Sequence, residues 1–183
     1  AKNNNGQHLH GGLVGFDKVF WNIEENQSNV GPSLKLTYNS KDGEEGYPGT
    51  LKITVVYTLT NANELKIDYH AVTDKKTIIN LTQHTYFNLT GNTKRDILDH
   101  ELVIQSDKFV PVSKVLIPTG KLQDVAATPF DFRSPQKVGA RIKEAEEQLV
   151  VGLGYDHCWV LSAADSLKFA ASVYEPGSGR FME

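Results

Sequence analysis

The residues best suited to chemistry lie in one polar stretch, Asn80–Gly91, which reads Asn-Leu-Thr-Gln-His-Thr-Tyr-Phe-Asn-Leu-Thr-Gly. It places one imidazole, His84, among amide and hydroxyl side chains and two aromatic rings. Polar groups beside aromatic faces suit a sugar. A histidine can donate and recover a proton near neutral pH without a large change in its pKa. The stretch is therefore the first candidate for an acid/base site.

A second pair of imidazoles, His8 and His10, precedes two glycines near the start of the chain. In an extended backbone these two side chains project from the same face, so they could supply two metal ligands. A tetrahedral site needs further donors, which the local spacing does not offer. The alternative is a polar loop whose glycines let the backbone approach a ligand closely, and this interpretation is favoured.

Asp156 and His157 follow a glycine-containing turn, in the sequence Gly152-Leu-Gly-Tyr-Asp-His157. Asp156 could hold a hydroxyl group of a ligand, orient His157 or cap a turn. Residue types alone leave these alternatives open, because short Asx turns are common at such positions. A separate acidic triplet, Asp42, Glu44 and Glu45, lies in a loop dense in turn residues, where charged side chains are usually solvated.

Length and composition predict one folded domain, since 183 residues with 39% hydrophobic and 22% charged side chains can build a core. The net charge of −3 and the dispersed basic residues argue against nucleic acid as a partner. No apolar run approaches the roughly 20 residues that cross a bilayer, so no membrane partner is expected. The single cysteine, Cys158, requires no oxidising compartment, which makes a cytoplasmic location the default.

The elements that would position these groups are mainly strands. Residues 51–59 and 65–71 alternate between apolar and polar side chains and predict an antiparallel hairpin across the turn at 61–63. A third strand is expected to begin at Thr77–Leu81 and to lead into His84. Further strands are expected at Glu101–Gln105 and at 167–173, whereas His70 and His100 are expected on the surface.

One short amphipathic helix is predicted after Ser134 and Pro135, because Val138, Ile142, Ala145 and Leu149 recur at helical spacing. Many strands with one short helix indicate an all-β, mostly antiparallel architecture. No glycine-rich phosphate-binding loop occurs, which disfavours nucleotide chemistry.

Several motifs together resemble the aldose 1-epimerase (galactose mutarotase) family, in the same order and over nearly the whole chain. They are His8-Leu-His-Gly-Gly12, Gly15-Phe-Asp-Lys18, Asp42-Gly-Glu-Glu-Gly-Tyr-Pro-Gly49, Asn80–Leu89, Ile117-Pro-Thr-Gly120, Thr128-Pro-Phe-Asp-Phe132, Gly154-Tyr-Asp-His157 and Ser178-Gly-Arg180. The resemblance implies a large antiparallel β-sandwich, or supersandwich, that binds a sugar in an open cleft. It also implies interconversion of the α and β anomers of aldohexoses such as galactose and glucose.

Matching by motif, His84 resembles the general acid that protonates the ring oxygen, with Thr85 and Tyr86 beside it in the sugar site. His10 is similar to the family's second active-site histidine, and Asp156 to the aspartate that binds sugar hydroxyls. The resemblance implies no metal and no organic cofactor. The partner it implies is a small aldose sugar.

The family's general base is a glutamate well after the Ser-Gly-Arg motif, and Glu183 does not match that position. An upstream Asn-Arg motif has no counterpart either. Residues 1–183 are therefore expected to form a single β-sandwich domain that is the central part of the fold, incomplete at both ends, and activity of these residues alone is not expected. The competing hypotheses are a non-catalytic sugar-binding or regulatory protein with the same fold, and a metal-dependent enzyme using His8, His10 and His157.

Overall fold

A computed structural model describes all residues from 1 to 183, and their contacts divide the chain into two compact units, Ala1–His84 and Thr85–Glu183. Antiparallel sheets dominate both, with one short α-helix, as the sequence predicts. No helix combines the length and the apolar character that a membrane span requires.

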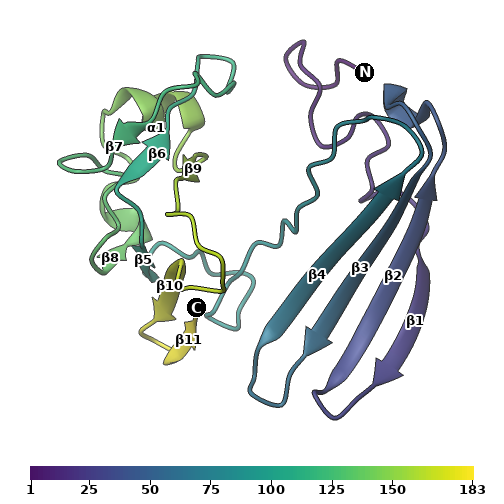
Figure 1. Cartoon of the computed structure of the whole chain (residues 1–183). Helices are drawn as coiled ribbons and strands as arrows, with labels where there is room; N and C mark the ends of the chain where they lie inside the picture. The colour runs from purple at the N-terminus through teal and green to yellow at the C-terminus, as the bar shows by residue number, and fades with distance from the viewer. The chain divides into compact units, whose positions relative to one another are not determined.

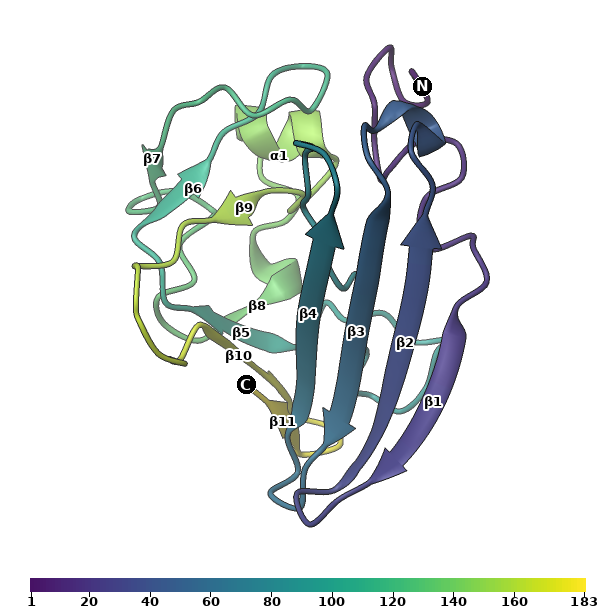
Figure 2. The ribbon, with the colours of Figure 1, turned by 45° about the vertical axis from the view of Figure 1, so that its right-hand side comes forward.

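The first unit is built on one four-stranded antiparallel sheet with the order β1-β2-β3-β4. Figures 1 and 2 both show these strands as long neighbours in chain order. Their bounds are β1 Asn22–Gln27, β2 Pro32–Ser40, β3 Leu51–Leu59 and β4 Leu65–Thr73. The prediction of a hairpin at β3 and β4 is confirmed, with Val55 opposite Tyr69 and Leu59 opposite Leu65.

The core of the first unit lies on the apolar face of β3. Leu51, Ile53 and Val55 alternate along the strand and are at most 8% exposed, as the period-two pattern requires. Phe16 and Trp21 pack against them from the preceding loop, and the Trp21 indole donates a hydrogen bond to the Phe16 carbonyl at 2.9 Å. Phe16 and Trp21 therefore belong to the core, whereas Phe20, also in this loop, is 99% exposed.

The second unit holds two small antiparallel sheets, with the orders β11-β10-β5-β8 and β7-β6-β9. A short helix, α1, spans Glu147–Gly152, and single 3-10 turns occur at Glu44–Gly46 in the first unit and Val138–Ala140 in the second. The strand bounds are β5 Glu101–Ile104, β6 Lys108–Val110, β7 Gln123–Asp124, β8 Gln136–Lys137, β9 Cys158–Trp159, β10 Ala171–Glu175 and β11 Arg180–Met182.

Aromatic rings form the core of the second unit. Phe109 and Phe130 are fully buried and stack face to face, with 4.2 Å between their ring centroids and 8° between their planes. Val125 and Leu149 complete the cluster, and Trp159 packs against it. The Trp159 indole donates to the Phe130 carbonyl at 3.0 Å, so its one polar group is satisfied.

The predicted helix after Ser134 and Pro135 is placed wrongly. Residues 136 and 137 instead form β8, which pairs with β5, and a 3-10 turn follows through Gly139. The helix begins only after Glu146, whose carboxylate accepts hydrogen bonds from the Gln148 and Leu149 amides and so caps it.

Three further predictions differ from the structure. Residues 77–81 form no strand, because no neighbouring segment of the described chain supplies ladder hydrogen bonds to them. His100, expected on the surface, is only 2% exposed. One ring nitrogen is satisfied, because Nε2 accepts a hydrogen bond from the Leu89 amide at 3.0 Å, whereas the buried Nδ1 has no partner within residues 1–183. The final strand is displaced to Ala171–Glu175.

Candidate functional site

The first unit brings together the two histidines that the sequence singles out, although they lie far apart along the chain. The rings of His10 and His84 meet edge to face, with 5.5 Å between centroids and 74° between planes. Both residues are exposed. His84 is therefore not sealed in the apolar interior, and both imidazoles are accessible from solvent.

A tight turn fixes the backbone at His10. Three consecutive residues have positive φ: His10 at 51°, Gly11 at 81° and Gly12 at 109°, and the Gly12 amide donates to the Leu9 carbonyl at 3.1 Å. The Asn3 side chain closes the loop, because its amide donates to the carbonyls of Leu9 and Gly12 and its oxygen accepts from the Leu9 amide. The glycines are thus needed for the turn itself.

Glu45, in the loop between β2 and β3, anchors the chain directly after this turn. Its carboxylate accepts hydrogen bonds from the amides of Leu13 and Val14, both at 3.0 Å. These donors, Val14 first, lower the pKa of Glu45, with burial opposing them. A Cβ on Gly12 would collide with the same carboxylate. The prediction that the acidic side chains of this loop are merely solvated is therefore wrong for Glu45.

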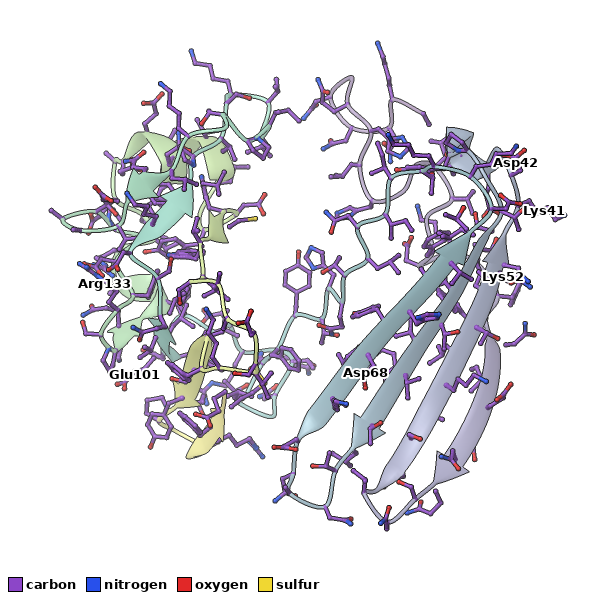
Figure 3. All side chains as sticks on the ribbon, viewed as in Figure 1. Lys41, Asp42, Lys52, Asp68, Glu101 and Arg133 are labelled. Atoms are coloured by element: carbon purple, nitrogen blue, oxygen red, sulfur yellow. The ribbon has the colours of Figure 1, made fainter.

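The other two acids of the loop are also bonded within the unit. Asp42, labelled in Figure 3, accepts from the Gly49 amide at 2.6 Å and pairs with Lys75. Glu44 accepts a 2.7 Å hydrogen bond from the Tyr38 hydroxyl, and this bond is the main reason why the pKa of Tyr38 is raised. All three acids of the loop thus make hydrogen bonds within the first unit.

His8 does not join His10 in a common site. The Tyr47 hydroxyl lies 2.8 Å from His8 Nε2, and the two rings meet edge to face at 5.4 Å. Nowhere in residues 1–183 do three His, Cys, Asp or Glu side chains gather as metal ligands.

In the second unit, the turn after α1 presents Asp156 to solvent. Leu153 ends the helix in the left-handed conformation, and the Gly154 amide donates to the Leu149 carbonyl at 2.9 Å. Tyr155 and His157 then point inward: the Tyr155 hydroxyl donates to the Pro129 carbonyl at 3.0 Å. Because side chains alternate along this extended segment, Asp156 faces outward and is exposed.

His157 is held by the core and not by Asp156. Its ring lies against Phe130, with centroids 4.7 Å apart, and its Nε2 is 3.2 Å from Gln148 Oε1. Burial lowers the pKa of His157, while the neighbouring Asp156 opposes that shift. The structure therefore shows no hydrogen bond to Asp156 that would orient His157, which was one of the three alternatives for Asp156.

Thr85 and Tyr86, the remaining candidates, are exposed residues of the second unit, and Tyr86 is 88% exposed. Asn3 and Glu45, whose side chains bond the backbone on either side of His10, are not singled out as site residues by the sequence. The only signal for Glu45 was its place in a motif of the family resemblance.

Comparisons with known proteins agree on one family. A family model described as aldose 1-epimerase matches residues 1–183. The chain is 43% identical over 183 residues to galactose mutarotase of Bos taurus, covering 100% of this chain and 51% of that protein. It is 41% identical over 167 residues to aldose 1-epimerase of Escherichia coli K12, covering 91% and 47%. The chain thus spans about half the length of the curated relatives it matches.

A solved structure is also similar. The crystal structure of galactose 1-epimerase from Lactobacillus acidophilus NCFM superimposes with a TM-score of 0.84 at 32% identity. The match covers 94% of this chain and 50% of that one.

Proposed function

Because the chain belongs to the aldose 1-epimerase family, we propose that the protein interconverts the α and β anomers of aldohexoses such as galactose and glucose. The observation that carries the proposal is the pairing of the exposed His10 and His84 rings at 5.5 Å. Two adjacent imidazoles can divide proton transfer and sugar orientation between them.

The reaction needs one acid and one base. As the acid protonates the ring oxygen, the bond from C1 to that oxygen breaks, and the base takes the proton of the C1 hydroxyl, so that an aldehyde forms. After rotation about the C1–C2 bond, both transfers run in reverse and close the ring as the other anomer. No bond to the protein forms, and no oxidant or reductant is consumed.

His84 is proposed as the acid, donating from its imidazolium to the ring oxygen and recovering the proton when the ring closes. His10, fixed by its glycine turn, holds the reacting end of the sugar. In the second unit, Thr85, Tyr86 and Asp156 are proposed to bind the sugar. The carboxylate of Asp156 suits hydroxyl groups because an ionised oxygen accepts stronger hydrogen bonds than a neutral one. The base is assigned to no residue of this chain.

Polarimetry of freshly dissolved α-glucose or α-galactose tests the proposal on the protein in its native length. His84→Gln is expected to lower the catalysed rate by about 10²–10⁴-fold, the usual contribution of a positioned acid. His70→Gln is the matched control, because His70 is an exposed histidine of β4 in the same unit and its loss should leave the rate unchanged. Unaccelerated mutarotation by the unmodified protein, or full acceleration by His84→Gln, would refute the proposal. Sugar binding without mutarotation would instead favour a binding or regulatory role.

A further inference from the structure

Both backbone polar groups of one residue, Leu89, are held by side chains in the second unit. The Leu89 amide donates to Nε2 of the buried His100 at 3.0 Å. The Leu89 carbonyl accepts two hydrogen bonds, from Ser178 Oγ at 2.9 Å and from Arg180 Nη1 at 3.0 Å. We call His100, Ser178 and Arg180 the Leu89 clamp.

The hairpin that joins β10 to β11 delivers two members of the clamp. Glu175, the last residue of β10, is 2% exposed, and its carboxylate accepts from the amides of Gly177 and Ser178 at 3.0 and 2.5 Å. The Gly179 amide donates to the Glu175 carbonyl at 2.9 Å. Because these hydrogen bonds to Glu175 hold the turn, they also fix the positions of Ser178 and Arg180 relative to Leu89.

The chain around Leu89 is shaped to receive the guanidinium. Gly91 has φ of 72°, and a Cβ there would lie 3.0–3.3 Å from three atoms of the Arg180 guanidinium, so a side chain would press on it. Asn88 and Thr90 close the turn, since Asn88 Oδ1 accepts from the Thr90 amide at 3.0 Å and from its hydroxyl at 2.6 Å. The contact between Arg180 and this turn therefore depends on several residues of both segments.

The Leu89 clamp fixes a backbone segment that no β-sheet holds. Residues 85–88 lie in no strand, so ladder hydrogen bonds do not set the backbone between Thr85 and Leu89. Tyr86 is only three residues before Leu89. A charge-assisted hydrogen bond from an arginine to a carbonyl is stronger than a neutral one and fixes direction as well as distance.

We propose that the Leu89 clamp positions the segment that begins at Thr85 and Tyr86, and that Ser178 and Arg180 are positioning residues for the epimerase reaction. This inference rests on the proposed function. It adds residues that need not touch the sugar but that hold the backbone leading into its site.

The test compares Arg180→Met, Arg180→Lys and Ser178→Ala in the protein at its native length, with kcat and KM measured by polarimetry. Arg180→Met is expected to lower kcat by about 10- to 100-fold, as small displacements of reacting groups do, at temperatures where circular dichroism shows the protein fully folded. Arg180→Lys should recover part of the loss, because a single donor to one carbonyl is within the reach of lysine. Ser178→Ala should lower kcat in the same direction.

Arg133→Met is the matched control. Arg133, labelled in Figure 3, is an arginine of the same unit whose partners are Asp131 and Asp107, so its removal costs ion pairs without touching Leu89. Hydrogen exchange at the Leu89 amide should quicken in Arg180→Met and not in Arg133→Met. If the unmodified protein accelerates mutarotation and Arg180→Met retains its kcat, the clamp proposal is overturned and the proposed function stands. If the unmodified protein is inactive, the proposed function fails.

Discussion

Replacement of Gln148 by methionine should destabilise the second unit far more than an exposed glutamine does. Gln148 is 8% exposed in α1, and its side chain makes two hydrogen bonds to the backbone of Val112. Oε1 accepts from the Val112 amide at 2.7 Å, and Nε2 donates to the Val112 carbonyl at 3.2 Å. Oε1 also lies 3.2 Å from His157 Nε2. Methionine matches the length of glutamine but can replace none of these bonds.

The size of the loss in stability follows from the Val112 amide and carbonyl, which lose their hydrogen-bond partners. Val112 is 9% exposed, so its amide and carbonyl would both lose a partner away from water. Each buried polar group without a partner costs about 1–3 kcal/mol. The buried apolar methionine offsets part of this, and we expect a net loss of about 2–4 kcal/mol in the free energy of unfolding.

Fluorescence provides the measurement, since Trp21 lies in the first unit and Trp159 packs against the core of the second. Urea unfolding of a Trp21→Phe background, followed through Trp159, reports the second unit. Gln123→Met is the control, because Gln123 is exposed in β7 and should change stability by no more than about 0.5 kcal/mol. If Gln148→Met behaves like this control, the double hydrogen bond to Val112 contributes nothing and the reasoning is refuted.

Three other predictions concern the first unit and the pH response. Burial lowers the pKa of His157, so the unfolded chain binds a proton more readily and stability should decline as pH falls below about 6.5; pH-dependent melting should show a smaller decline in His157→Gln. Gly12→Ala should lower kcat/KM in polarimetry by about tenfold or more, because the new Cβ displaces the Glu45 carboxylate that anchors the His10 turn. Gly6→Ala is the control: Gly6 also has a positive φ, of 79°, but no atom lies within 4 Å of the added Cβ. This substitution should leave kcat/KM unchanged. Ile53→Ala should cost about 2–5 kcal/mol in urea unfolding, whereas Ile78→Ala, at 79% exposure, should cost little.

The sequence predicts local features well where a period repeats. Alternation along residues 51–59 and 65–71 is enough to identify β3 and β4, because one face of each strand is buried. The sequence offers no such signal for β1, because all six of its residues are exposed and show no alternation. The predicted helix starts too early because apolar residues recur at helical spacing from Val138 on, whereas Gln136 and Lys137 pair with β5 and a 3-10 turn follows at Val138–Ala140.

The candidate site depends on contacts that no local pattern encodes. His84 stands out by residue type, but its approach to His10 results from folding of the first unit. Glu45 looks like any acid of a polar loop until that loop meets the amides of Leu13 and Val14. His100 looked like a surface residue for the same reason, since its partner amide at Leu89 belongs to a turn without secondary structure.

Leu153, at the end of α1, is a position where a substitution can increase stability. It adopts the left-handed backbone with φ of 55°, and its side chain is 95% exposed, so it packs against almost nothing. That conformation costs a residue with a side chain about 1 kcal/mol relative to glycine. Leu153→Gly should therefore raise the melting temperature without changing the backbone path from α1 to Asp156.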